Sequence, residues 1–311
     1  DETIHESIYV YDFFEDYWAP ETVGPERIEM VIILENESRY NAVVSGDVDV
    51  ASVELPTVAQ AEAAGLEVVT WPALRHGLNF IDLNGVFADE DVRKAICYGI
   101  NFDEINAAQY DGYSQWHAQR HNPGQVGYVD SLPGYPYDQD LALEHMEAAG
   151  NPDVTFSLPA AGSQATQAQL FRQQMADIGI TVEIDDVTSP QYFSTYQSGD
   201  YDAYFNTSSA EDTGPPGLYH FRWTPNGTAN PLNNSVPELD EIIERGFAAE
   251  TLDAQTEIWE EFTQTVYDMA LACGFYDLPH AAIWDGDRVE NVRGQVWFPS
   301  HLRYRDIRVL D

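Results

Sequence analysis

The stretch VTFSLPAAGSQATQAQLFRQQMADIGITVEIDDVTSPQYFSTYQSGDYDAYFN, residues 154–206, alternates between strand-like and helix-like patterns. Short apolar runs rich in β-branched and aromatic residues predict strands at 154–158, 180–184 and 201–206. Between them, residues 164–178 have a helical pattern that Gly179 ends, and Ser189 with Pro190 predicts the N-cap and first residue of a second helix. A β-α-β-α-β order implies parallel strands with helices on the faces, so the sequence predicts an α/β fold.

Similar patterns extend in both directions from this stretch. Strands are predicted at 27–34, which reads as a buried run, and at 48–53, 66–70, 78–83, 275–284 and 292–297. Helices are predicted at 37–45, 57–64, 138–149, 236–249 and 252–272, with Gly46 as the stop of the first. Two more helices begin after Asp89 and Asn101, and Glu104 is placed to complete a reciprocal capping box with Asn101. Residues 111–137 form a long excursion rich in Gly, Pro and Tyr.

The charge balance is strongly acidic. The chain has 53 Asp and Glu against 14 Lys and Arg, a net charge of −39 over 311 residues, and Lys94 is its one lysine. Such a surface repels itself in dilute buffer, and salt screens the repulsion. Because the acids are spread along the whole chain, we expect a protein of an extreme halophile. Nucleic-acid binding is disfavoured because phosphate contacts need clustered basic residues. Disorder is disfavoured because 44% hydrophobic residues are enough for a core.

Features of secretion and the two cysteines come next. The chain starts at Asp1 without a signal peptide, as a processed or trimmed protein would, and no run is long enough for a transmembrane helix. Glycosylation acceptor motifs begin at Asn36, Asn206, Asn226 and Asn233 and favour export. Cys97 and Cys273 both lie in apolar helical patterns, which favours two buried thiols, although a single bridge between them stays possible.

No catalytic or metal motif stands out. With 53 carboxylates almost any pocket would hold two, so an acid pair is a weak signal for a hydrolase. His117 and His121 have helical spacing but run into Pro123 and Gly124, and we read them as unrelated loop residues. HExxH, GxGxxG, P-loop and GxSxG motifs do not occur. We expect no enzyme, no cofactor and no metal, with a secreted hydrolase using paired carboxylates as the alternative.

Six segments belong together in order and spacing. They are RYNAVVSGDVDVASVELP (39–56), ADEDVRKAICYGINFDEINAAQYDGY (88–113), YPYDQDLALEHMEAAG (135–150), FRQQMADIGITVEIDDV (171–187), YQSGDYDAYFN (196–206) and PELDEIIERGFAAETLDAQTEIWEEFTQTVYD (237–268). Together they resemble extracellular solute-binding protein family 5, the dipeptide- and oligopeptide-binding components of ABC importers, here of a haloarchaeal type. The match begins near Tyr17 and Trp18, which resemble the middle of a typical member, so the N-terminal part and its lipid anchor are expected to be missing.

The resemblance implies a periplasmic-binding-protein-like (type II) fold. Two α/β lobes would be joined by crossover strands that act as a hinge: an incomplete lobe I at 1–79 plus 280–311, and lobe II at 80–279. A small ligand would bind between the lobes and pass unchanged to a membrane permease. The ligand is expected to be a short peptide, with oligosaccharides and metal chelates as alternatives. We expect a monomer at the cell surface; a receptor-linked sensory role is a further alternative.

Candidate ligand residues also follow from the resemblance. In peptide-binding members an aspartate holds the ligand's α-amino group, and its position matches Glu211, with Asp212 as its neighbour. The family tryptophan before it is replaced in the stretch that contains Ser208, and the family asparagine of the first crossover strand is Ile81. Further candidates are Ser208 itself, Asn79 in the crossover strand, and two aromatic residues, Trp116 and Trp284. For Glu211 the alternative is an ordinary surface acid, and for both tryptophans it is core packing.

Overall fold

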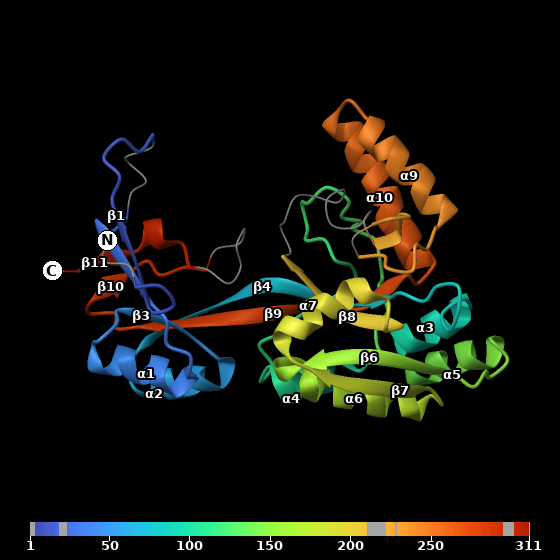
Figure 1. The fold of residues 1–311 in the computed structure, drawn as a ribbon, viewed down its shortest axis with the longest axis horizontal. Helices are drawn as coiled ribbons and strands as arrows, with labels where there is room; N and C mark the ends of the chain where they lie inside the picture. Colours follow the sequence, from blue (N-terminus) through green and yellow to red (C-terminus); the bar gives the residue numbers. More distant parts are fainter. Residues whose placement is uncertain (1–3, 19–23, 210–221, 228, 295–301, 311) are drawn as a thin grey trace. The chain divides into compact units, whose positions relative to one another are not determined.

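The structure is a computed structural model that describes residues 4–18, 24–209, 222–227, 229–294 and 302–310. The chain forms two compact units (Figure 1). Unit 1 comprises Asp1–Leu74 and Leu278–Asp311, and unit 2 comprises Arg75–Asp277. The lobe boundaries predicted from the sequence lie at 79/80 and 279/280, a few residues later along the chain. Strands β4 (Glu67–Phe80) and β9 (Ala272–Trp284) pair with each other and carry the chain between the units.

β4 is one long strand, whereas the sequence predicted two separate strands at 66–70 and 78–83. Pro72 and Gly77 interrupt the apolar pattern but not the strand. At Gly77 the ring of Phe275 lies against the backbone, and a Cβ there would be 2.4 Å from a ring carbon. A glycine in a strand often marks such a close approach. Pairing with β9 therefore outweighs the local break.

Unit 1 is built on the outer ends of β4 and β9. β3 (Val50–Val53) pairs antiparallel with β9, and helices α1 (Asn36–Ser45) and α2 (Val58–Ala63) flank β3 in sequence. The core of unit 1 contains Trp71, Ala282, Trp284, Val289, Val292, Leu302 and Ile307. β10 (Val289–Glu290) pairs with β11 (Arg308–Val309), and short 3-10 turns lie at Leu55–Thr57 and Tyr304–Asp306.

Two strand predictions in unit 1 are wrong. Residues 27–34 were expected to be buried, but β2 (Arg27–Val31) alternates between exposed and half-buried residues and pairs only with β1 (Ile8–Asp12) within the described residues. A two-stranded ribbon has too few neighbours to bury both faces. The strand expected at 292–297 is reduced to one isolated bridge, Gly294 to Leu302, and residues 295–297 lie outside the described part.

Unit 2 contains the predicted βαβ element. β6 (Thr155–Ala161) and β7 (Thr181–Val187) are parallel and are joined by α6 (Ala165–Asp177), which confirms the parallel pairing for this pair. β8 (Ala203–Ser209) departs from the prediction, because it lies beside β4 in the other sheet. Asp202 links the two sheets: its Oδ2 accepts hydrogen bonds from the Ser157 backbone N–H and hydroxyl, both at 2.7 Å.

Four more helices of unit 2 begin near the predicted residues. They are α3 (Glu90–Tyr98), α4 (Phe102–Gln109), α5 (Gln139–Ala148) and α7 (Ser189–Ser198). Asp89, Asn101 and Asp138 cap the first three. Two capping details differ from the prediction: Thr188, not Ser189, caps α7, and the backbone N–H of Asn101 donates to Gln174 instead of Glu104. Gln174 reaches this N–H from α6, so a tertiary contact replaces the local capping box.

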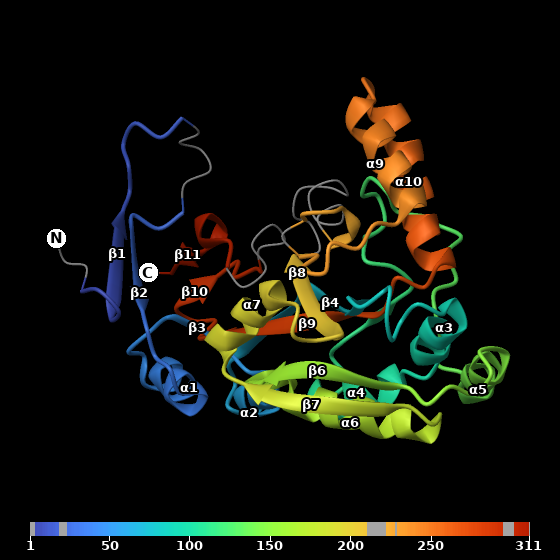
Figure 2. The ribbon, with the colours of Figure 1, turned by 45° about the vertical axis from the view of Figure 1, so that its right-hand side comes forward.

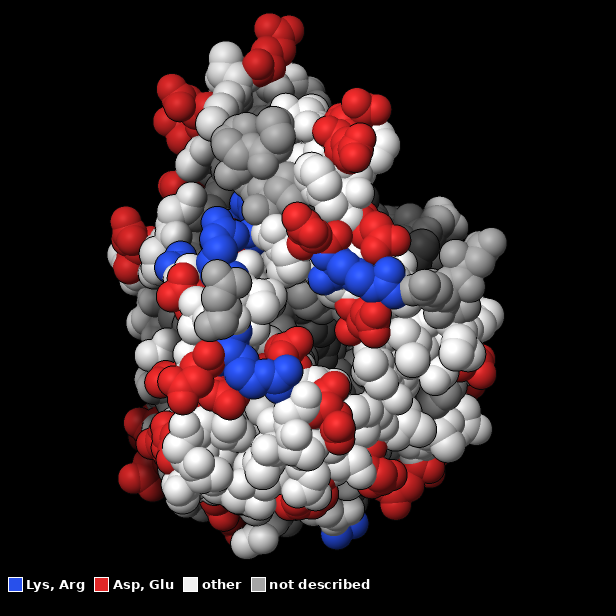
Figure 3. Space-filling model, turned by 90° about the vertical axis from the view of Figure 1, so that its left-hand side faces the viewer, with Lys and Arg blue, Asp and Glu red and all other residues white. Residues whose placement is uncertain are grey.

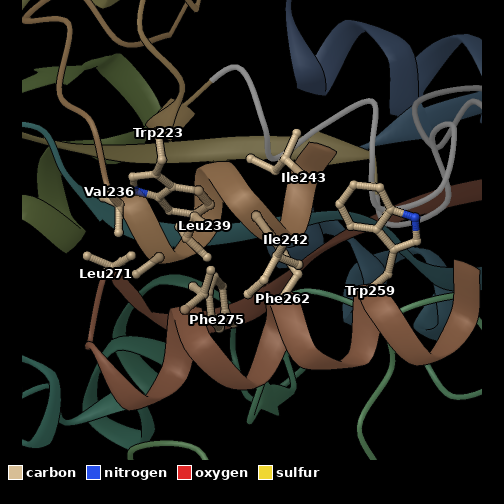
Figure 4. Packing of buried hydrophobic residues seen from close by; sticks show 11 residues of the cluster. Trp223, Val236, Leu239, Ile242, Ile243, Trp259, Phe262, Leu271 and Phe275 are labelled. Carbon is tan, nitrogen blue, oxygen red and sulfur yellow. The ribbon is translucent and has the colours of Figure 1, made fainter. Parts of the chain in front are cut away.

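The sheet of β4, β8 and β9 lies between two layers of unit 2 in both ribbon views (Figures 1 and 2). On one side are α4, α6 and the β6–β7 pair. On the other are α9 (Pro237–Ala248) and α10 (Leu252–Asp268), which lie side by side. Figure 4 shows Ile242 of α9 beside Phe262 of α10, and Leu239 and Ile243 belong to the same buried cluster. Trp223 and Phe275 belong to the same buried cluster, which attaches this helical hairpin to β9.

Cys97 and Cys273 form a disulfide, so the favoured prediction of two buried thiols is wrong. The sequence predicts a helix over 252–272, but α10 ends at Asp268, and Ala270 has a positive φ of 51°. Cys273 therefore lies in β9, facing the end of α3 that carries Cys97. The bond ties α3 to a strand that connects the units.

Charges are distributed as a highly acidic sequence requires. Figure 3 shows Asp and Glu side chains scattered over one face of the protein with few Lys and Arg among them. Among the buried residues of the described ranges, Asp277 is the one carboxylate. Carboxylates stay in water because burying a charge is costly without a partner. Asp277 is the exception, and its carboxylate has two charged or polar side-chain partners, Arg75 and His117.

Candidate functional site

The structure places the sequence-predicted ligand residues in different environments. Glu211 and Asp212 lie outside the described residues, and Ser208 belongs to β8, where only its backbone is described. Trp116 is half-buried in β5 (Trp116–His117) and pairs with Tyr276 of β9. Trp284 packs in the core of unit 1, in line with the core-packing alternative. Asn79 is buried in β4 of unit 2, on a face of the sheet that carries further buried polar side chains.

That face is identified by strand alternation. Arg75, Gly77 and Asn79 are two residues apart on β4 and share one side of the sheet. The Arg75–Asp277 ion pair and the contact of Phe275 with Gly77 add the same side of β9. We call the set Arg75, Asn79, Asn206, Phe275 and Asp277 the polar face.

Asn206 of β8 belongs to this set for the same geometric reason. His76 lies on the opposite side of β4, where its ring stacks on Phe205 with centroids 5.5 Å apart. The side chain of Asn206 follows Phe205 in the strand and therefore points to the side of Asn79. Because Phe275 packs in the cluster of α9 and α10, the polar face is the side of the sheet that these helices cover.

A buried ion pair marks one end of the polar face. Arg75 Nε lies 3.0 Å from Asp277 Oδ1, and the other guanidinium nitrogens donate to the Gln119 carbonyl at 2.9 Å and to Asn122 Oδ1 at 2.6 Å. The second carboxylate oxygen of Asp277 lies 2.8 Å from His117 Nε2. Arg75 and Asp277 are the first and last residues of unit 2. The pair therefore joins the entering and leaving strands where the chain crosses between the units.

Two more arginines are buried in this part of unit 2. Arg120 lies over the ring of Phe275, with its guanidinium carbon 5.3 Å from the ring centroid. Burial, and secondly the positive charge of Arg120, lower the pKa of Arg222. Burial also lowers the pKa of His121 to about 3, with Arg120 and Arg75 adding to the effect. These shifts indicate a region of unit 2 where cationic side chains lie close together away from water.

A cavity lies next to these side chains. Its volume is about 20 Å³, enough for one water molecule, and its lining includes Gln119, Arg120, Thr263 and Phe275. The buried amide of Asn234 lies nearby in unit 2: its Nδ2 donates to the Ile81 carbonyl at 2.6 Å, and its Oδ1 accepts from Nδ2 of the exposed Asn84 at 3.0 Å. Hydrogen-bonding amides and guanidinium groups suit the binding of polar or anionic groups.

Most residues of the polar face and its surroundings were not predicted from the sequence. Arg75, Arg120, Arg222 and Asp277 carry no local motif, and Asp277 is one of 53 acids. A usable signal was the scarcity of basic residues: in a chain with 14 of them, an arginine beside the strand run HGLNF stands out. Asn206 was noted only as a glycosylation motif, and its burial contrasts with the exposed Asn226 and Asn233.

Metal sites and membrane-spanning helices were looked for among the described residues. No group of three or more His, Cys, Asp or Glu that could hold a metal is found there, and His117 and His121 serve different neighbours, Asp277 and Thr263. No described helix combines the length and the apolar character needed to cross a membrane.

Comparison with known proteins gives the relatives of this chain. Residues 2–230 match the family described as bacterial extracellular solute-binding proteins, family 5 Middle. The di/tripeptide-binding protein 3 of Pseudomonas aeruginosa is 26% identical over 202 residues, which are 61% of this chain and 38% of that protein. The chain thus spans well under half the length of this relative.

Solved structures share the fold. NikA from Brucella suis in complex with Fe(III)-EDTA matches with a TM-score of 0.85 at 16% identity, covering 100% of this chain and 67% of that one. The dipeptide-binding protein from Pseudoalteromonas sp. SM9913 in complex with Met-Leu matches with a TM-score of 0.77 at 16% identity, covering 99% and 63%. The predicted α/β fold of the periplasmic-binding-protein type is thereby confirmed. The family match covers most of the chain, and the chain belongs to family 5 of the extracellular solute-binding proteins.

Proposed function

We propose that this protein is the solute-binding component of an ABC importer and that it binds a short peptide or a similar small polar solute. Membership of family 5 supports the role. The observation that carries the ligand class is the polar face of unit 2, where the buried amides of Asn79 and Asn206 lie on one side of a sheet and Arg120 lies over the Phe275 ring. Such groups hydrogen-bond carboxylates and amides, which are the polar groups of a peptide.

We also propose that the ligand leaves unchanged. A hydrolase of the type considered above needs two carboxylates near one bond. Within the described part of the chain, Asp277 is the one buried carboxylate, and Arg75 and His117 already occupy both of its oxygens. An acid held in this way is a poor candidate for proton transfer.

The relatives favour a peptide over other solutes. The Pseudomonas relative is named for di- and tripeptides, and one structural match holds Met-Leu. Another match holds a metal chelate, so a chelate is the outcome that would redirect the proposal. Delivery to a permease, a monomeric state, a lipid anchor and a ligand held between two lobes remain predictions from the family resemblance.

The direct test is binding of defined ligands. Isothermal titration of the full chain with dipeptides, tripeptides and Fe(III)-EDTA is expected to give saturable heat with a peptide, and mass spectrometry afterwards should recover the peptide intact. Glu211→Gln should weaken peptide binding by about 1.5–3 kcal/mol if its carboxylate holds the α-amino group. Glu241→Gln, an exposed acid of α9, is the control with the same change in charge. No peptide heat, or cleaved peptide, would contradict the proposed function.

We propose, secondly, that the protein works in molar salt. The net charge of −39 and the scattered acidic side chains in Figure 3 support this. The Debye length falls from about 10 Å at 0.1 M to about 3 Å at 1 M salt, so repulsion between neighbouring carboxylates is largely removed. The melting temperature should rise from dilute buffer to about 2 M KCl. An equal melting temperature in both would speak against adaptation to salt.

A further inference from the structure

Two buried amide side chains on the polar face carry a polar atom without a hydrogen-bond partner in the described part of the protein. Asn79 is 2% exposed, and Asn206 is 5% exposed. Asn79 Nδ2 donates to the Gly77 carbonyl at 3.0 Å, which leaves Oδ1 as an unpartnered acceptor. Asn206 Nδ2 is an unpartnered donor.

The two asparagines lie on neighbouring strands and on the same side of the sheet. β4 carries Asn79, β8 carries Asn206, and the two strands are hydrogen-bonded neighbours. Adjacent strands are about 4.8 Å apart. His76 and Phe205 meet across these two strands, and Asn79 and Asn206 are only three and one residues further along, so the acceptor and the donor lie in the same part of the polar face.

These two atoms add no hydrogen bond to the described part of the fold. Buried polar groups in native proteins are nearly always hydrogen-bonded, and an unbonded one destabilises the folded state. The contrast within unit 2 is clear: Asn230 and Asn234 are equally buried, and their side chains bond the Thr224 and Ile81 carbonyls and each other. Polar atoms kept without partners in a buried site are consistent with a partner that arrives from outside.

An extended peptide has matching groups. In a paired β-strand, the N–H and the C=O of one residue point to the same edge and are used together by the neighbouring strand. One acceptor and one donor of a binding site can take the place of that strand's two groups. A carboxylate, by contrast, has only acceptors, so it can use Asn206 but not Asn79.

We propose that Asn79 and Asn206 form a subsite for the backbone N–H and C=O of one residue of a peptide ligand. Asn79 Oδ1 accepts the N–H of a ligand residue, and Asn206 Nδ2 donates to a carbonyl oxygen of the ligand. The inference rests on the proposed function and assigns two side chains of unit 2, Asn79 and Asn206, to the recognition of the ligand backbone.

The test separates a ligand role from a structural role. Asn206→Leu and Asn79→Leu replace an amide by an apolar group of similar size, and Asn234→Leu is the control at a fully bonded amide. The melting temperature of the ligand-free Asn206→Leu protein should be unchanged or higher, while its Kd for the best dipeptide should rise about tenfold or more. Asn234→Leu should lower the melting temperature.

The ligand can be varied as well. A depsipeptide, in which an ester replaces the amide of that dipeptide, lacks the N–H that Asn79 would accept. It should bind wild type about tenfold more weakly than the dipeptide, and it should bind Asn79→Leu with no further loss, because the two changes remove the same contact.

The outcomes are distinct. If wild type binds the dipeptide and both variants bind it equally well, the subsite is overturned and the proposed function stands. If Asn206→Leu melts as early as Asn234→Leu, the amide is structural and the subsite is also overturned. If wild type binds no peptide at all, the proposed function fails, and the subsite fails with it.

Discussion

Replacing Arg75 by methionine is the perturbation whose cost follows most directly from the structure. The side chains of Arg75 and Asp277 are 1% and 7% exposed, so the pair is shielded from water. Arg75→Met removes the ion pair and the bonds to Gln119 and Asn122, and it leaves the Asp277 carboxylate buried with His117 as its remaining side-chain partner. Breaking a buried pair on one side costs about 3–5 kcal/mol, because an uncompensated charge stays behind. We expect a loss of unfolding free energy in this range.

A matched control is present in α9 and α10. Arg245 pairs with Glu261 at 2.6 Å, but these side chains are 43% and 50% exposed. Arg245→Met changes the net charge by the same amount as Arg75→Met, and an exposed pair contributes less than about 1 kcal/mol. The difference between the two variants therefore isolates burial from charge.

The assay is urea denaturation in about 2 M KCl, where surface repulsion is screened. The double variant Arg75→Met with Asp277→Leu should recover part of the loss, since both charges leave the interior together. An Arg75→Met protein within about 1 kcal/mol of Arg245→Met would refute the reasoning, because a buried pair and an exposed one would then cost the same. A double variant less stable than Arg75→Met would also refute it.

Two further predictions concern the disulfide and the buried histidines. Reduction of the Cys97–Cys273 bond, or its replacement by two alanines, should lower the unfolding free energy by about 2–5 kcal/mol, because the bond closes a loop with a sequence separation of 176 residues; identical urea midpoints with and without reductant would contradict this. Burial lowers the pKa of His76 and of His121 to about 3, from an ordinary value of 6.5. Both are therefore neutral in the folded protein and take up protons on unfolding below pH 6.5, so the stability present above that pH is lost as the pH falls towards 3. His76→Phe should reduce the slope of unfolding free energy against pH between pH 6.5 and pH 5, by at most about 1.4 kcal/mol per pH unit; parallel slopes for the variant and wild type would show that His76 does not titrate on unfolding.

The sequence by itself determined the local structure and the family. Asp89 and Asn101 do cap their helices, Gly46 ends α1 in the left-handed region, and the βαβ order between 155 and 187 gives a parallel pair. These features depend on residues within a few positions of each other. The six family segments predicted the family correctly for a similar reason, because their residues and their order along the chain can be read from the sequence alone.

The tertiary structure alone decided which distant residues meet. Arg75 bonds Asp277 across 202 positions, Cys97 bonds Cys273 across 176, and β8 joins β4 although its pattern fitted a third strand beside β6 and β7. Whether the side-chain amides of Asn79 and Asn206 have hydrogen-bond partners depends on which groups the fold brings next to them. Such contacts depend on how the chain turns back on itself, and no local periodicity records where a strand crosses from one unit to the other.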